Sequence, residues 1–126
     1  MRKLYRTRTF TRWMRKTGLS DAVLSRAVAE MAQGLIDADL GGHVFKKRVA
    51  LPGQGKRGGA RVLVGTRLAD RWFFIFGFGK NERSNIDKDE LKVLQEVAKE
   101  LLAFNDSQLA AAMSVGEIME MKDGKD

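Results

Sequence analysis

The sequence predicts an α+β fold in which a small, mostly antiparallel sheet packs against an N-terminal helical hairpin and a C-terminal helix. Three apolar runs with strand character follow one another at Val44–Leu51, Ala60–Leu68 and Trp72–Phe78. Two amphipathic helical patterns precede these runs and another follows them. Short turn-forming segments between the runs favour antiparallel pairing of successive strands.

The first thirty-six residues predict a short strand and two helices. The strand is expected over Leu4–Thr9, and Thr9 is expected to cap a helix that runs to Thr17. Gly18 ends that helix, and Ser20 caps a second one that extends to about Gly34 or Ile36. The first helix has an apolar side made of Phe10, Trp13 and Met14, and a basic side made of Arg8, Arg12, Arg15 and Lys16.

After a loop over Asp37–Gly42, the first strand of the central region alternates in character. Lys46 and Arg48 are expected on one face, whereas Lys47 points to the other face with Phe45 and Val49. Pro52 ends the strand, and the loop over residues 53–59 carries Lys56 and Arg57. This glycine-rich loop is not a P-loop, because it lacks the Lys-Ser/Thr pair and is followed by a strand.

The next two strands complete the core of the sheet. Arg61 shares a face with Leu63, while Val62 and Val64 point the other way. The strand over Trp72–Phe78 is apolar on both faces, so we expect it to be central and covered by helices.

The C-terminal part predicts two further helices. Asp87 and Glu90 have the spacing of a capping box, and the helix that they begin should end near Phe104–Asn105. A second helix is expected over Ser107–Met121, and the last residues are expected to fray. We therefore predict a domain over residues 1–105, followed by a helical extension and tail over residues 106–126.

The length and the charge of the chain indicate how many domains it forms and what class of ligand it binds. A chain of 126 residues suits one domain. Its net charge of +7 is uneven: residues 1–85 hold 18 Lys and Arg against 6 Asp and Glu (18 − 6 = +12), and residues 86–126 hold 5 against 10 (5 − 10 = −5). A basic body indicates a face that binds phosphate, although solubility alone also explains it.

Several classes of site and location are excluded by composition. The absence of cysteine excludes disulfides, thiolate metal sites and a cysteine nucleophile. The single histidine, His43, excludes a multi-histidine metal centre. No apolar run is long enough to span a membrane or to serve as a signal peptide, so we expect a cytoplasmic protein.

The motifs KKRVA, GKRGGARV and GKNERS, in their order along the chain, resemble those of the RelE/ParE toxin superfamily, most closely its HigB-type branch. The similarity covers roughly residues 3–104. It implies a RelE-like fold related to microbial ribonucleases. It also implies a toxin of a type II toxin–antitoxin system that cleaves mRNA in the ribosomal A site without a metal or other cofactor. The expected partners are mRNA, the ribosome and a helix-turn-helix antitoxin.

The resemblance also implies roles for individual side chains. RNA cleavage without a metal needs a base for the 2′-hydroxyl, an acid for the 5′-oxygen and cations for the phosphate. The family's catalytic positions fall on a set of cations from separate strands: Lys46, Arg48, Arg61 and Lys80. Further contacts to RNA are expected from Lys47, Lys56, Arg57, Glu82 and Arg83.

Two positions depart from the family's pattern. Asn81 stands where relatives carry an arginine, and Asp87 where they carry a tyrosine. Proton transfer would then fall to Lys80, to a Lys46 with a lowered pKa, or to Glu82. His43 is the obvious general base by residue type, yet it lies outside the motif positions.

Two other functions remain open from the sequence. A non-catalytic toxin of the ParE type would use the basic face to bind DNA gyrase, which the two departures favour. A plain RNA- or ribosome-binding module would bind in a salt-sensitive manner without any chemistry.

Overall fold

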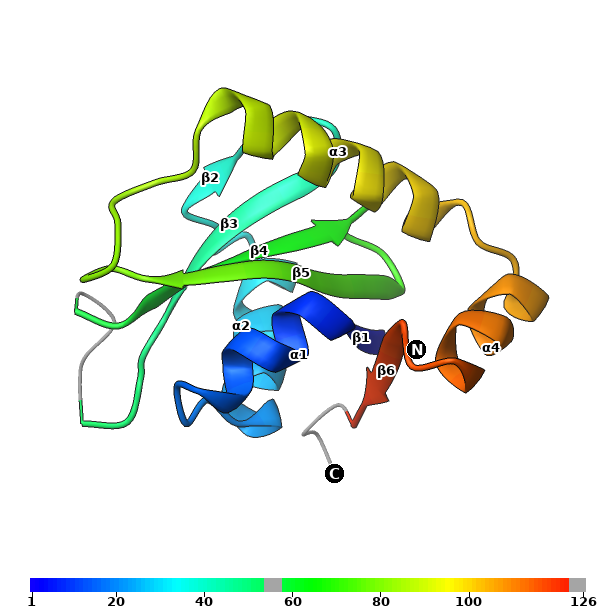
Figure 1. Cartoon of the computed structure of the whole chain (residues 1–126), viewed down its shortest axis with the longest axis horizontal. Helices are drawn as coiled ribbons and strands as arrows, with labels where there is room; N and C mark the ends of the chain where they lie inside the picture. The colour runs from blue at the N-terminus through cyan, green and yellow to red at the C-terminus, as the bar shows by residue number, and fades with distance from the viewer. Residues whose placement is uncertain (54–57, 123–126) are drawn as a thin grey trace.

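The computed structural model describes residues 1–53 and 58–122. Within these residues one six-stranded sheet has the order β2-β3-β4-β5-β1-β6, with helices on both faces (Figure 1). Its strands are β1 (Lys3–Thr7), β2 (Ala38–Asp39), β3 (Val44–Val49), β4 (Ala60–Thr66), β5 (Arg71–Gly79) and β6 (Ile118–Met121). The helices are α1 (Arg8–Arg15), α2 (Asp21–Ala32), α3 (Lys88–Leu102) and α4 (Asp106–Ser114).

The predicted α+β class and mostly antiparallel sheet are confirmed. Every neighbouring pair of strands is antiparallel except β1 and β5, which run parallel. The first strand therefore lies inside the sheet, between β5 and β6. Lys56 and Arg57 lie outside the described residues. None of the described helices is long and apolar enough to cross a membrane.

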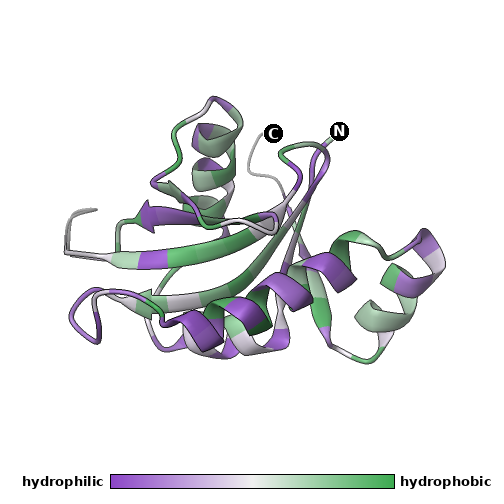
Figure 2. Ribbon diagram, turned by 90° about the horizontal axis from the view of Figure 1, so that it is seen from above, coloured by the Kyte–Doolittle hydropathy of each residue, from purple (hydrophilic) through white to green (hydrophobic). Residues whose placement is uncertain are grey.

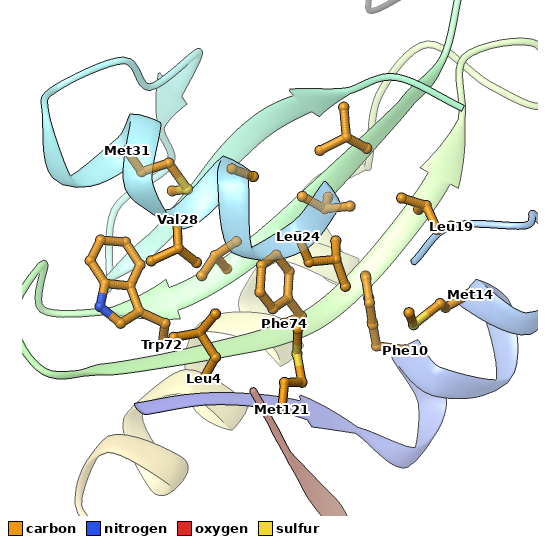
Figure 3. Packing of buried hydrophobic residues seen from close by; sticks show 14 of the residues in the cluster. Leu4, Phe10, Met14, Leu19, Leu24, Val28, Met31, Trp72, Phe74 and Met121 are labelled. Carbon is orange, nitrogen blue, oxygen red and sulfur yellow. The ribbon is translucent and has the colours of Figure 1, made fainter. Parts of the chain in front are cut away.

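The helices divide the hydrophobic core into two layers. On one face, α1 and α2 pack against the sheet through side chains such as Phe10, Leu24 and Phe74, which Figure 3 shows together with Trp72. On the other face, α3 and α4 cover Tyr5, Leu63 and Phe73. In Figure 2 the central strands are hydrophobic along most of their length, as expected for strands covered on both sides.

Local signals account for most helix starts. Ser20 caps α2 by accepting a hydrogen bond from the backbone N–H of Val23. The capping box expected at the start of α3 is present, with Asp87 and Glu90 bonded reciprocally. The first helix begins earlier than predicted, because Thr7 rather than Thr9 caps it and accepts from the N–H of Phe10. As a result β1 is shorter than predicted, since it ends at Thr7.

A bulge in β5 changes which aromatic side chains share a face. Val64 pairs with Phe74, but its neighbour Leu63 pairs with Phe76, so Ile75 is an extra residue on β5. Strict alternation would keep Phe74 and Phe76 on the same face. Instead Phe74 joins the α1–α2 side, and Phe76 lies on the α3 side.

The expected helix over Ser107–Met121 is wrong in its second half. The helix α4 ends at Ser114, Gly116 adopts a left-handed conformation with φ 77°, and Ile118–Met121 forms β6. β6 pairs with β1 in antiparallel fashion and buries Ile118 and Met121. The chain after residue 105 therefore extends the sheet. The loop expected over residues 37–42 likewise contributes the short strand β2, which pairs with β3.

Candidate functional site

Three cations of β3 and β4 lie on the same face of the sheet. Lys46 pairs with Leu63, and Arg48 pairs with Arg61, so all four side chains point to the α3 side. Side chains paired in this way have Cβ atoms about 4.5–5.5 Å apart. Two arginines directly opposite each other repel, and an anion placed between them would relieve that repulsion.

Arg61 is the most enclosed member of this group, at 8% exposure. Its neighbour on the other side is Phe78 of β5, which is also buried. Its Nη1 donates a hydrogen bond of 3.4 Å to the carbonyl oxygen of Ala60. A guanidinium held between strands in this way is more restricted than one on a surface loop, and such restriction favours a fixed geometry toward a bound group.

Arg48 belongs to this group of cations, and Lys80 lies at the same end of the sheet. The Arg48 side chain is half-exposed, and its Nε lies 3.6 Å from a carboxylate oxygen of Asp37. Lys80 follows the end of β5, and its backbone N–H donates to the carbonyl oxygen of Gly59 just before β4. The end of β5 and the start of β4 therefore lie side by side at this end of the sheet (Figure 1). We call Lys46, Arg48, Arg61 and Lys80 the cationic cluster.

The turn after β5 is closed by Glu82. Its carboxylate accepts a hydrogen bond of 2.6 Å from the N–H of Gly79, and the carbonyl oxygen of Gly79 accepts from the N–H groups of Glu82 and Arg83. A Cβ on Gly79 would lie 2.8 Å from the side-chain oxygen of Asn81. Both polar side chains of the turn are thus folded back against Gly79.

Arg83 links this turn to α3. Its guanidinium carbon lies 5.5 Å from the ring centroids of both Phe76 and Phe78, and its Nη2 donates a 2.5 Å hydrogen bond to Glu90. The hydrogen bond from Arg83 is the main reason that the pKa of the Glu90 carboxyl lies below its usual value. The same bond raises the pKa of Arg83. Arg83 is therefore fixed in position by a carboxylate and two aromatic rings.

Lys47 does not belong to the cationic cluster, although an RNA contact was expected from it. Its side chain points to the α2 side, where it is 5% exposed. Its Nζ lies 2.8 Å from a carboxylate oxygen of Glu30 and donates to the carbonyl oxygen of Leu35. The ammonium group joins β3 to α2 on the face opposite the cationic cluster.

His43 lies at the opposite end of β3 from Arg48. It precedes β3 in a left-handed conformation (φ 65°), and its carbonyl oxygen accepts from the N–H of Thr66. At about 3.3 Å per strand residue, five residues separate it from Arg48 by about 16 Å. His43 is thus too far from Arg48 to share its site.

The two departures from the family's pattern have structural uses here. Asp87 accepts the N–H of Glu90 at 2.8 Å as the cap of α3. Asn81 lies against Gly79. Neither position presents the planar ring or the extra guanidinium that relatives carry.

Sequence reasoning missed the aromatic side of the site. Strict alternation would place Phe76 and Phe78 on the same face as Trp72 and Phe74, and the bulge at Ile75 moves them to the face of Arg61. No residue type in this segment signals that bulge. Glu90 was recognised as a cap, but its second carboxylate oxygen and its contact with Arg83 depend on tertiary structure.

The site offers cations and aromatic rings rather than metal ligands. Among the described residues, no group of three or more His, Cys, Asp or Glu side chains is arranged to hold a metal ion. The cationic cluster would bind an anion and stabilise negative charge that develops on it.

Comparison with known proteins supports a toxin fold. Residues 2–121 match the family described as the RelE toxin of the RelE / RelB toxin-antitoxin system. The match extends through β6, beyond the end of α3. No curated protein matches the chain.

Proposed function

We propose that this chain, which belongs to the RelE toxin family of toxin–antitoxin systems, is an endoribonuclease that cuts mRNA on the ribosome. The observation that carries the proposal is the convergence of Lys46, Arg48 and Arg61 on one face of adjacent strands, with Lys80 at the same end of the sheet. Cleavage at such a site would stop translation, as expected of a toxin.

The reaction is an internal transfer at one phosphodiester. The 2′-oxygen attacks phosphorus and its proton passes to a base, while the bond from phosphorus to the 5′-oxygen breaks and that oxygen takes a proton from an acid. The products are a 2′,3′-cyclic phosphate and a 5′-hydroxyl. Arg48 and Arg61, opposite each other, are suited to hold the phosphate as its negative charge redistributes.

Proton transfer is assigned to the lysines that flank the arginines. Lys46 lies one alternation step from Arg48 on the same face, and Lys80 lies at the end of β5. Glu82 is less suited, because one of its carboxylate oxygens is used to bind the N–H of Gly79. A metal cation would be repelled by the cationic cluster, which supports a reaction driven by side chains.

Replacing Arg61 by alanine tests this function. Losing one oriented charged contact to the transition state should lower the rate of mRNA cleavage in a purified ribosome assay by about 10²-fold. Arg26→Ala is the matched control, because Arg26 is an exposed cation on α2.

Because Arg61 is buried, thermal unfolding should accompany the assay to show that the variant is folded. Equal cleavage rates for folded Arg61→Ala and for the wild-type protein would refute the assigned role. A variant that does not fold is replaced by Arg61→Lys, which keeps the charge but loses the forked geometry and should still slow cleavage.

A second candidate function is inhibition of DNA gyrase without RNA cleavage. It is favoured by Asp87, which caps α3 where relatives carry a tyrosine. It predicts DNA damage in cells that express the toxin, with messages left intact. A third candidate, RNA or ribosome binding without chemistry, predicts intact messages and no DNA damage.

The toxin family implies an antitoxin. We propose an antitoxin of the helix-turn-helix type, which is the usual partner in the HigB-type branch that the motifs resemble. Its contacts with the cationic cluster should be acidic or apolar. Coexpression of the neighbouring open reading frame should restore growth, and its failure to do so would point to another partner.

A further inference from the structure

We propose that a recess between α1 and the open edge of β5 binds a single nucleobase of the RNA substrate; the inference rests on the proposed function. The recess has a volume of about 260 Å³. Pockets that hold drug-sized ligands have volumes of about 300–1,000 Å³, so this one suits a single ring system. Its walls are Trp13 from α1, Phe76 and Phe78 from β5, and Arg83 from the following turn.

The floor of the recess is an open strand edge. β1 covers β5 only along residues 71–74, and within the described residues no strand pairs with the later part of β5 on that side. Lys80 donates to Gly59 on the β4 side, and Gly79 bonds to Glu82 on the opposite side. Because backbone groups alternate in direction along an antiparallel strand, the N–H and C=O of Gly77 point to the same side as those of Gly79.

Gly77 therefore presents a donor and an acceptor to the recess. A Cβ at this position would lie 2.4 Å from the ring of Trp13, so the indole lies directly against the strand and leaves no space for a side chain. The edge of a nucleobase also carries donors and acceptors side by side, which matches this backbone.

The walls of the recess are stacking surfaces. Arg83 is held 5.5 Å from the centroids of Phe76 and Phe78 and is tied to Glu90. Trp13 lines the recess from α1, and Phe10 lies beside it at a centroid distance of 5.5 Å. Unpaired RNA bases stack on aromatic rings and on arginine planes, so this combination fits a base better than an aliphatic side chain.

The recess is lined by one carboxylate, that of Glu82, and several cations lie around it. Arg12 is exposed on α1, and Lys16, the exposed C-cap of that helix, lies three positions after Trp13. Lys80 is exposed at the end of β5. These cations are placed to bind phosphates on either side of a stacked base.

The open edge is also too short to receive an added peptide strand. Only residues 75–78 lie between the part of β5 that pairs with β1 and Gly79, whose edge is closed by Glu82. A planar ring needs one donor and one acceptor, whereas strand addition needs a longer row of them. Phe78, which lines the recess, lies opposite Arg61 of the cationic cluster. The bound base would therefore belong to a nucleotide next to the cleaved phosphate.

The test uses a short single-stranded oligoribonucleotide and a set of copies in which each position in turn is abasic. Trp13 is partly exposed and Trp72 is fully buried, so quenching of tryptophan fluorescence reports the recess. We expect the intact strand to quench the wild-type protein, and one abasic position to weaken binding about 10-fold.

Trp13→Leu keeps an apolar side chain but removes the stacking ring. Its affinity for the intact strand, measured by fluorescence anisotropy, should fall by about the same factor of 10, and the critical abasic position should cause no further loss. Arg26→Ala, which lies on α2, should behave as the wild-type protein does. If Trp13→Leu does not fold, Phe76→Leu provides the same comparison.

The outcomes separate this inference from the proposed function. If Arg61→Ala abolishes cleavage but every abasic strand binds as well as the intact one, the base pocket is wrong and the nuclease stands. If the wild-type protein cleaves no RNA but the abasic effect depends on Trp13, the pocket stands and the nuclease is wrong. Quenching by the antitoxin but not by RNA would show that a protein occupies the recess and would overturn the inference.

Discussion

Adjacent cations of β3 have different roles because they point to opposite faces of the sheet. Lys46 and Arg48 lie on the face that carries the cationic cluster. Lys47, between them, is buried against Glu30 of α2. Alternation along a strand predicts that Lys47 points away from its neighbours, but it does not predict a carboxylate on the other side. The partner comes from α2, whose register against β3 is a tertiary property.

Replacing Lys47 by methionine should destabilise the protein without changing how it binds RNA. Removing one partner of a buried ion pair costs about 3–5 kcal/mol. Because Glu30 keeps 25% exposure, we expect about 2–3 kcal/mol of lost unfolding free energy, measured by urea denaturation. The salt dependence of RNA binding should stay as in the wild-type protein.

Arg48→Ala is the matched comparison from the opposite face. It should leave stability nearly unchanged, because the Arg48 side chain is half-exposed and its Nε lies 3.6 Å from the carboxylate of Asp37. The slope of log affinity against log salt concentration should fall by about 1. An equal loss of slope in Lys47→Met would mean that Lys47 contacts phosphate after all.

At the scale of elements, the turn after β5 is fastened to α3 by one carboxylate. Glu90 accepts the N–H of Asp87 with one oxygen and binds Arg83 with the other. The first contact belongs to a capping box that the sequence predicts from its spacing. The contact with Arg83 depends on the turn after β5, which places the guanidinium over Phe76 and Phe78.

Glu90→Gln should weaken the contact between Arg83 and α3, and the resulting loss of stability should depend on pH. The pKa of Glu90 is lowered in the folded state, chiefly by the hydrogen bond from Arg83. Its stabilising contribution is therefore complete above the ordinary value of 4.5 and is lost as pH falls through the lowered folded-state value. Urea denaturation from pH 7 to pH 3 should show a smaller decrease in stability for Glu90→Gln than for the wild-type protein.

The control for that experiment is Glu96→Gln, an exposed carboxylate on the same helix. Its pH profile should follow the wild-type profile apart from a small uniform offset. Parallel profiles for Glu90→Gln and the wild-type protein would contradict the assigned role of Glu90. Glutamine retains an acceptor for the capping box, so the comparison isolates the contact with Arg83.

Like β2, the strand β6 is an element that the sequence did not predict. Ile118 and Met121 fit a helical stripe as well as a strand, and a four-residue strand gives too short a pattern to decide. Gly116 is the usable signal, because a left-handed glycine ends α4 two residues before the strand begins.

Ile118→Ala should therefore be strongly destabilising. Ile118 is 2% exposed and packs in the layer with Tyr5 and α4, so its truncation should cost about 2–4 kcal/mol. Val115→Ala is the control, since Val115 is 60% exposed and should change stability by less than about 0.5 kcal/mol. Similar urea midpoints for the two variants would contradict the placement of β6.

For the whole molecule, the sequence predicts the layers better than the site. Helical stripes and caps predict α1, α2 and α3, and strand alternation places Lys46, Arg48 and Arg61 on one face, in agreement with the pairing. The bulge at Ile75 cannot be predicted from local sequence patterns, because it is defined by the pairing of β4 with β5. The aromatic side of the site depends on that bulge. The recess beside Trp13 also depends on where β1 ends.

The proposed nuclease activity requires Arg48 and Arg61 to act on one phosphate. A double-mutant cycle on single-turnover mRNA cleavage tests this most directly, with Arg48→Ala, Arg61→Ala and the double variant measured on the same ribosome-bound message. Residues that act as a unit give non-additive losses, so the double variant should be little slower than Arg61→Ala alone. Losses that multiply in full, or no loss from either substitution, would contradict a shared phosphate site.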